Sequence, residues 1–187
     1  MQNTKLQTLL AHPTAEGAVT PVQVTAMAQV MPGSVLLFFR LGHARHQLRL
    51  PTAAGGQRAD GLWRQTCCEA FLGVLDGPEY LECNLATNGD WALYHFAGYR
   101  DALPLPSATP PVISADWDGD DLLVRALFDR ALWPQRFTRG SLTIGLSAVL
   151  ALPAGGLSYH ALAHPRDVPD FHDARARQAA LGVLVSK

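Results

Sequence analysis

The sequence contains few charged residues and no excess of either sign. Only 17% of its 187 residues are charged, and the formal net charge at pH 7 is −1. Proteins that bind nucleic acids or anionic membrane surfaces carry clusters of basic side chains, whereas the charges here are scattered. We therefore expect neither nucleic acid nor a membrane as a partner. The longest apolar runs are also far shorter than the roughly 20 residues that a transmembrane helix needs.

Cysteines are few, and several motifs of known chemistry are missing. Cys67, Cys68 and Cys83 lie within apolar segments, which is typical of buried, reduced thiols. No CxxC spacing indicates a zinc site, and the histidines are dispersed. The GxSxG, P-loop and GxGxxG motifs are absent, so acyl transfer and nucleotide chemistry have no support. We expect no metal, no cofactor and no catalytic residue.

The first residues lack the charged start and the apolar segment of a secretory signal. This favours a cytoplasmic location, although a mature secreted form without its leader would have a similar sequence. A chain of this length is long enough for one well-buried core. We expect a single domain over residues 1–187.

Short alternating apolar and polar runs, separated by turns, dominate the sequence. The predicted strands cover residues 5–10, 22–30, 34–41, 46–50, 62–75, 80–86, 90–97, 112–117, 121–128, 141–152 and 157–163. Short strands at such spacing predict an all-β, antiparallel sandwich. Asn88-Gly89 favours a type I′ hairpin turn, and Asp118-Gly119 marks a second hairpin. Residues 102–112 carry four prolines and are expected to form a loop, whereas residues 174–185 fit either a short helix or a last strand.

Polar side chains recur at strand-interior positions between residues 61 and 100. Because side chains alternate between the two faces of a strand, Tyr80, Glu82 and Asn84 share one face. The same count along residues 62–75 places a second set on one face, namely Trp63, Gln65, Cys67, Glu69 and Phe71. Such a polar face is either solvated or lines a site, and we expect a site.

The two carboxylates on these strands, Glu69 and Glu82, face each other if the strands pair. They could act as acid and base on a glycosidic bond, bind sugar hydroxyls, or form ion pairs with Arg100 or Arg125. A solvated sheet face with such ion pairs remains the main alternative to a site.

Aromatic residues next to these polar positions are candidates for stacking on the C–H faces of a sugar. Trp63 and Tyr94 fit best. Trp91 shares its strand face with Leu93 and His95 and is therefore expected in the core.

Residues 164–172 form an unusual loop of sequence HPRDVPDFH. His164 and Asp170 could close over the polar face and take part in binding. The alternative is a structural loop in which the ring and the carboxylate cap backbone groups.

Three parts of the sequence together carry a family resemblance. They are LWRQTCCEAFL (62–72), YLECN (80–84) with GDWA (89–92) and FAGYR (96–100), and the late HP…DFH (164–172). In these the chain resembles bacterial DOMON-like proteins related to family 9 carbohydrate-binding modules. The resemblance implies a jelly-roll-like β-sandwich that binds a ligand, commonly a sugar, on a concave sheet face. The haem-binding DOMON branch uses a methionine and a histidine as axial ligands, and the only methionines here are Met1, Met27 and Met31.

The sequence thus predicts a non-catalytic module for a carbohydrate or a similar polar small molecule. Its expected ligand-binding residues are Trp63, Gln65, Glu69, Glu82, Asn84, Tyr94, Arg100, His164 and Asp170. The alternatives are a glycoside hydrolase that uses Glu69 and Glu82, a haem or redox module, and an oligomeric structural protein. The pattern specifies neither the ligand nor the oligomeric state.

Overall fold

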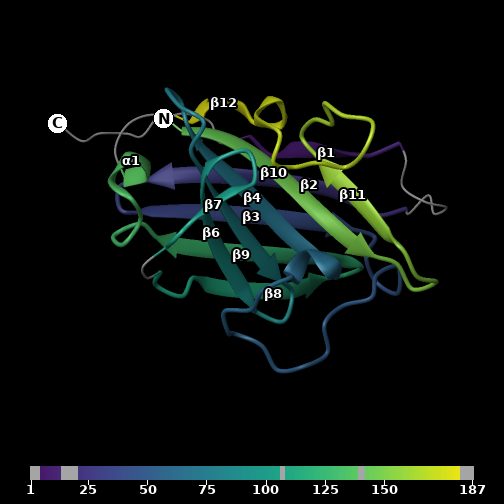
Figure 1. Cartoon of the computed structure of the whole chain (residues 1–187). Coiled ribbons are helices and arrows are strands. Elements are labelled where there is room, and N and C mark those ends of the chain that lie inside the picture. The colour runs from purple at the N-terminus through teal and green to yellow at the C-terminus, as the bar shows by residue number, and fades with distance from the viewer. Residues whose placement is uncertain (1–4, 14–20, 106–107, 139–141, 182–187) are drawn as a thin grey trace.

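Short strands make up most of the molecule (Figure 1). The computed structural model describes residues 5–13, 21–105, 108–138 and 142–181. The strands in these ranges are β1 (Gln7–Ala11), β2 (Gln23–Met31), β3 (Ser34–Gly42), β4 (Cys67–Val74), β5 (Tyr80–Ala86), β6 (Trp91–Gly98), β7 (Asp101–Leu103), β8 (Val112–Asp118), β9 (Asp121–Asp129), β10 (Leu142–Ala151), β11 (Leu157–Ala161) and β12 (Gln178–Leu181). The helical turns are η1 (Leu62–Arg64), α1 (Gln135–Thr138) and η2 (Ala174–Ala176). None of these helices is long and apolar enough to cross a membrane.

The strands form two stacked layers. Antiparallel pairing gives the order β7-β6-β5-β4-β10-β11-β1-β2-β3-β9-β8, with β12 also paired to β10. We call β2, β3, β8 and β9 the back sheet, and β4 to β7 with β10 to β12 the front sheet. In Figure 1 the front strands pass diagonally across the back strands, and β1 joins the layers by pairing with β11 and β2. The predicted antiparallel sandwich is confirmed.

The main hydrophobic core lies between the two sheets and follows the alternation of each strand. From the back sheet it takes Val24, Ala26, Ala28, Val30, Val35, Leu37, Phe39, Leu41, Leu122, Val124, Ala126 and Phe128. From the front sheet it takes Cys68, Ala70, Leu72, Leu81, Cys83, Leu85, Trp91, Leu93, Leu142, Ile144, Leu146, Ala148 and Leu150. Trp91 is therefore a core residue, as predicted. All three cysteines are buried and free.

The front sheet is covered on its outer face as well. Every residue of β4 and β5 is buried, whereas β2 alternates between buried and more accessible positions. A second apolar cluster of Phe71, Tyr80 and Phe96 lies on this outer face, and Phe171 packs against it. Phe171 belongs to residues 162–173, between β11 and η2, which we call the closing segment.

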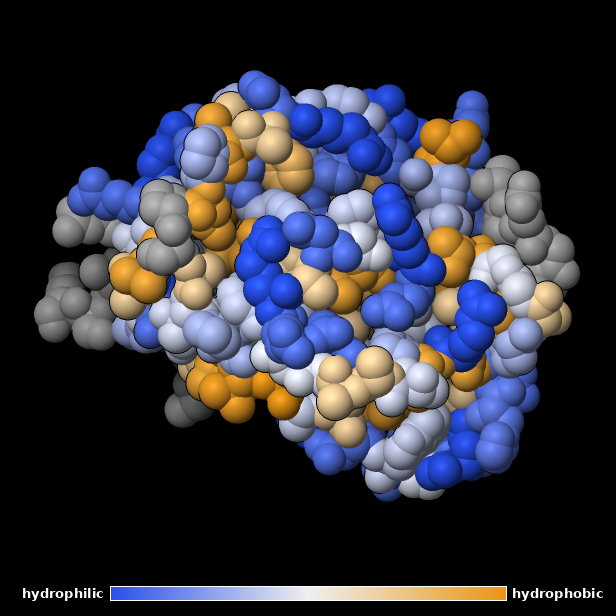
Figure 2. All heavy atoms as spheres, turned by 60° about the horizontal axis from the view of Figure 1, so that its bottom comes forward, coloured by the Kyte–Doolittle hydropathy of each residue, from blue (hydrophilic) through white to orange (hydrophobic). Residues whose placement is uncertain are grey.

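The surface is mostly polar and carries separate hydrophobic patches. On the side shown in Figure 2, hydrophobic side chains form separate patches among hydrophilic ones. Large exposed hydrophobic residues of the β8–β9 hairpin include Val112, Trp117 and Leu127.

The strand predicted from Leu62 begins later than expected. Residues 62–64 form η1 after Gly61, whose φ of 77° is left-handed. Pairing with β10 starts where Cys67 lies opposite Val149. Just before Cys67, the Thr66 hydroxyl donates to Arg49 O at 2.8 Å and accepts from Ala151 N at 3.1 Å. A side chain thus makes the hydrogen bonds that backbone groups make within the sheet. The count of alternating faces therefore holds only from Cys67 onward.

The strand predicted at residues 46–50 is absent from the structure. His43 and His46 both have positive φ, 58° and 63°, which turns the chain instead of extending it. Arg49 N does donate to Ala151 O at 2.8 Å, but residues 46–50 form no strand beside β10.

Turn and loop predictions also need correction. At Asn88-Gly89 the loop has three residues, because Ala86 N donates to Asp90 O and Gly89 N donates to Ala86 O. Only Gly89 has positive φ there, at 92°, so the turn is not the type I′ that was predicted. The loop expected at residues 102–112 begins with the end of β7, which pairs with β6 before the first proline.

The last described residues contain a helical turn and a strand. Within residues 174–181 the chain forms η2 and then β12, so both open alternatives occur in succession. Residues 182–185 of that prediction lie outside the described ranges. The sequence pattern did not predict α1.

Candidate ligand-binding site

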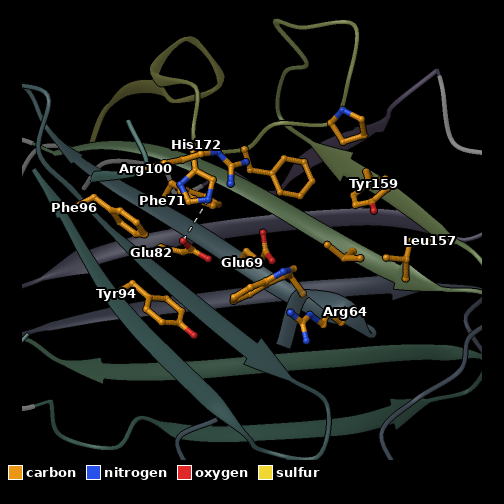
Figure 3. A pocket seen from close by; sticks show the side chains of 14 residues that line it. Arg64, Glu69, Phe71, Glu82, Tyr94, Phe96, Arg100, Leu157, Tyr159 and His172 are labelled. Atoms are coloured by element: carbon orange, nitrogen blue, oxygen red, sulfur yellow. Dashed lines mark ion pairs between the residues drawn. The ribbon is translucent and has the colours of Figure 1, made fainter. Parts of the chain in front are cut away.

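A cavity of about 630 Å³ opens on the outer face of the front sheet (Figure 3). Side chains from β4, β5, β6, the β6–β7 turn, β10, β11, η1 and the closing segment surround it. The lining residues are Trp63, Arg64, Glu69, Phe71, Glu82, Tyr94, Phe96, Arg100, Val149, Leu157, Tyr159, Pro169, Phe171 and His172. Its volume is in the range typical of small-molecule sites, about 300–1,000 Å³.

Glu69 and Glu82 lie beside each other at the centre of the cavity (Figure 3). They are only 2% and 5% exposed. In the β4–β5 register Glu69 lies opposite Asn84, and Glu82 lies opposite Phe71. The two glutamates are therefore diagonal neighbours on one face, a relation in which residues are about 7–8 Å apart.

The two carboxyl groups differ in their surroundings. Burial, and then the charge of Glu82, raise the pKa of Glu69 well above its ordinary value, against a hydrogen bond from Ser147 Oγ at 3.3 Å. Burial also raises the pKa of Glu82, but Asn84 Nδ2, which donates to Oε1 at 2.7 Å, and the charge of Arg100 oppose the shift. Glu69 therefore keeps its proton to a higher pH than Glu82.

Asn84 is a neighbour of both acids in the strand register. Its side chain is fully buried, Nδ2 donates to Glu82 Oε1, and Oδ1 has no hydrogen-bond partner among the described residues. Glu69 stands directly opposite on β4, and its protonated form carries an O–H of the kind that a carbonyl oxygen accepts.

The closing segment places one polar side chain, His172, against the carboxylates. His172 Nδ1 lies 2.7 Å from Tyr80 Oη, and Nε2 lies 3.7 Å from Glu82 Oε2. The rings of Phe71 and Phe96 contact the imidazole at centroid distances of 5.2 and 5.3 Å. Burial, and next the charge of Arg100, lower the pKa of His172 to about 4, so that its imidazole is neutral at neutral pH.

Aromatic side chains form the walls. Trp63 and Tyr94 meet edge to face with centroids 6.2 Å apart, and Tyr159 contacts Phe171 at the same distance. Tyr94 Oη donates to Asp60 Oδ1 at 2.7 Å, which fixes the tilt of its ring. Burial, and then this contact with Asp60, raise the pKa of Tyr94, so its hydroxyl stays protonated.

Five of the nine predicted site residues line the cavity. They are Trp63, Glu69, Glu82, Tyr94 and Arg100. Gln65 does not line it, because the chain turns through η1, and Gln65 N closes that turn on Leu62 O. Asn84 does not line it either, although its Nδ2 donates to Glu82 Oε1. Ligand binding by these residues stays a prediction.

The two predicted closing residues have structural contacts instead. His164 Nε2 hydrogen-bonds Leu10 O at 2.7 Å, outside the cavity. Asp170 anchors the closing segment, because its carboxylate accepts from Tyr99 Oη at 2.7 Å, from Arg100 Nη2 at 3.2 Å and from His172 N at 3.2 Å. The capping alternative describes both residues better.

Sequence reasoning missed several lining residues. Phe96 shares a β6 face with Tyr94, so alternation could have found it. Tyr159 and His172 carry no such signal, since their position depends on β11 lying beside β10 and on the course of the closing segment. Among the described residues, no three His, Cys, Asp or Glu side chains gather closely enough to hold a metal ion.

The arrangement of the chain has counterparts among solved structures. A scan against protein-family models and a search of curated proteins both find no match. A candidate carbohydrate-binding protein from Bacteroides uniformis superposes with a TM-score of 0.66 at 12% identity, over 96% of this chain and 86% of that chain.

Two further structures are of a family 9 carbohydrate-binding module from Caldicellulosiruptor kristjanssonii. The complex with glucose has a TM-score of 0.60 over 99% of this chain and 86% of that chain, at 11% identity. The fold is that of the family 9 carbohydrate-binding modules. The complex with cellotriose agrees, with a TM-score of 0.57 over 94% and 77% of the two chains, also at 11% identity. The predicted resemblance to this fold is confirmed, while the DOMON relationship stays a prediction.

Proposed function

We propose that the chain is a non-catalytic module that binds a carbohydrate in the cavity of the front sheet. The observation that carries the proposal is the combination of Glu82 and Glu69 with aromatic walls in one cavity. A carboxylate accepts strong, charge-assisted hydrogen bonds from hydroxyl groups, and aromatic rings cover the apolar faces of a sugar. Two structures of the same fold hold glucose and cellotriose, which supports this ligand class.

A glycoside hydrolase is the second candidate function. A glycosidase places its two carboxyl groups about 5–10 Å apart on either side of the scissile bond. Glu69 and Glu82 are diagonal neighbours on one sheet face, a relation of about 7–8 Å that falls in this range, so an activity assay has to separate binding from hydrolysis. Haem has little support, because Met27 and Met31 belong to β2 of the back sheet and do not line the cavity.

Titration calorimetry with glucose, cellotriose and a panel of other mono- and oligosaccharides tests the proposal. We expect Glu82→Gln to weaken binding of the best sugar by about 10-fold or more, the usual effect of losing a charged hydrogen-bond partner. The matched control is Asp116→Asn, which changes an exposed carboxylate of β8 and should leave affinity unchanged.

Two outcomes would contradict the proposal. One is an absence of binding to every sugar in the panel, or equal affinity in the Glu82→Gln variant. The other is release of product from aryl glycosides that disappears in Glu69→Gln, which would support the hydrolase instead. Circular dichroism of each variant checks that the fold is retained.

A further inference from the structure

The gap between His172 and Glu82 has the dimensions of a site for one hydroxyl group. Nε2 and Oε2 are 3.7 Å apart, too far for a direct hydrogen bond (Figure 3). An oxygen atom placed to one side of the line between them can lie about 2.8 Å from both. Both side chains line the cavity, so a ligand can reach this point.

The hydrogen bonds behind His172 determine which of its nitrogens carries the proton. Arg100 N donates to Tyr80 Oη at 3.2 Å, so the tyrosine oxygen already accepts once. If His172 Nδ1 also donated to it, the buried Tyr80 O–H would have no acceptor among the described residues. Donation from Tyr80 to Nδ1 gives the Tyr80 hydroxyl both its donor and its acceptor partner. A neutral imidazole then carries its hydrogen on Nε2, facing Glu82.

Glu82 supplies the acceptor that complements the Nε2–H donor of His172. Its Oε1 accepts from Asn84 Nδ2 at 2.7 Å, which leaves Oε2 as an acceptor toward the cavity. A donor and an acceptor thus converge on one point. The rings of Phe71 and Phe96 both pack edge to face against the imidazole.

We propose that His172 and Glu82 together recognise a single hydroxyl group of the sugar, which accepts from Nε2–H and donates to Oε2. This inference rests on the proposed function and adds a specificity-determining residue, His172. A hydroxyl group is both donor and acceptor, and so matches the pair. An ether oxygen lacks the hydrogen that Glu82 needs, an ammonium group cannot accept from Nε2–H, and a deoxy position leaves both groups unpaired.

The chain of contacts also gives Tyr80 a role as a positioning residue. Its hydroxyl orients the imidazole without lining the cavity. Tyr80→Phe keeps the ring that stacks on Phe96 at 4.7 Å and removes the donor to Nδ1. The imidazole then loses its preference for the Nε2–H tautomer.

Nitrogen NMR of the histidine rings in the sugar-free protein is the first test. We expect His172 as the Nε2–H tautomer in the wild type and a mixture of tautomers in Tyr80→Phe. His164→Phe, which changes a histidine of the same segment outside the cavity, should leave the His172 signals in place. Observation of His172 as the Nδ1–H tautomer in the wild type would overturn the inference.

Binding of glucose and its 2-, 3-, 4- and 6-deoxy analogues is the second test. We expect loss of one particular hydroxyl to lower affinity by about 10- to 100-fold, and this difference to shrink in His172→Phe, where the hydroxyl keeps only its bond to Glu82. A deoxy penalty of equal size in His172→Phe and the wild type would refute the role of His172 while leaving sugar binding intact. If no sugar of the calorimetry panel binds, the inference falls together with the proposed function, whereas the tautomer measurement still tests the orientation of the imidazole.

Discussion

The outer faces of the two sheets show how differently one alternating pattern can be used. On the back sheet, outward polar residues lie in water, and an ion pair such as Arg125–Asp116, at 3.5 Å, has side chains 45% and 65% exposed. Pairs of this kind contribute little to stability. On the front sheet, Glu69 and Glu82 occupy equivalent outward positions but are almost completely buried.

The difference shows that the free-energy cost of a charged residue on a strand depends on whether its face of the sheet is covered. Covered by the closing segment, the front-sheet acids are removed from water, and their ionisation becomes unfavourable. A chain under selection for stability alone would replace them with apolar residues. Their presence at the centre of a cavity agrees with the proposed ligand-binding role.

Matched phenylalanine substitutions should give the largest contrast between the two faces. Phe71 is fully buried on the outer face of the front sheet, whereas Phe38 on the outer face of the back sheet is half-buried beneath Arg125. We expect Phe71→Ala to lower the free energy of unfolding by about 3–5 kcal/mol and Phe38→Ala by less than about 1 kcal/mol. Urea denaturation measures both. Equal losses would mean that the front face is no better packed than the back.

Removing the anchor of the closing segment should have an intermediate effect. Asp170 accepts hydrogen bonds from three residues and pairs with Arg166 at 3.2 Å. Because several donors lose a charged partner together, Asp170→Ala should cost about 2–3 kcal/mol. The exposed Asp116→Ala should stay within about 0.5 kcal/mol. Thermal and urea unfolding provide the comparison. If Asp170→Ala left the free energy of unfolding unchanged, the aromatic contacts of Phe171 and His172 would be enough to hold the closing segment.

The smallest and most specific contrast depends on pH. Since the pKa of Glu69 is higher in the folded state than in the unfolded chain, the folded state binds more protons above the ordinary pKa. Stability therefore falls as the pH rises from that value through the raised pKa, by about 1.4 kcal/mol for each unit of the shift. Glu69→Gln removes this loss and keeps a side chain of nearly the same shape.

The expected result is a variant as stable as the wild type at pH 4 and more stable at pH 8. Urea unfolding over this range measures the effect, with Asp116→Asn as the control that follows the wild-type profile. Parallel profiles for Glu69→Gln and the wild type would show that Glu69 ionises normally in the fold.

Alternation along strands was the part of the sequence that predicted the structure best. It placed Glu82 and Asn84 on one face and Trp91 in the core, because side-chain direction within a regular strand depends only on position. It failed for Gln65, since Gly61 introduces a left-handed turn and the chain passes through η1 before β4 begins.

Counting alternate positions along a strand could not predict contacts between distant segments. His172 lies next to Glu82 although 90 positions separate them in the sequence. Nothing in the local pattern states that the closing segment folds back over β5, because this depends on β11 lying beside β10 and on the hydrogen bonds to Asp170. His164 had the more noticeable sequence context and turned out to contact Leu10.

The origin of His172 in a loop has a consequence for how such proteins diverge. The sheets supply the carboxylates, and their side chains also support the framework, so mutations there are constrained by folding. The closing segment adds its imidazole from outside the framework. If the module binds sugars as proposed, its selectivity can change by exchange of a few residues of this segment while the sheets stay the same.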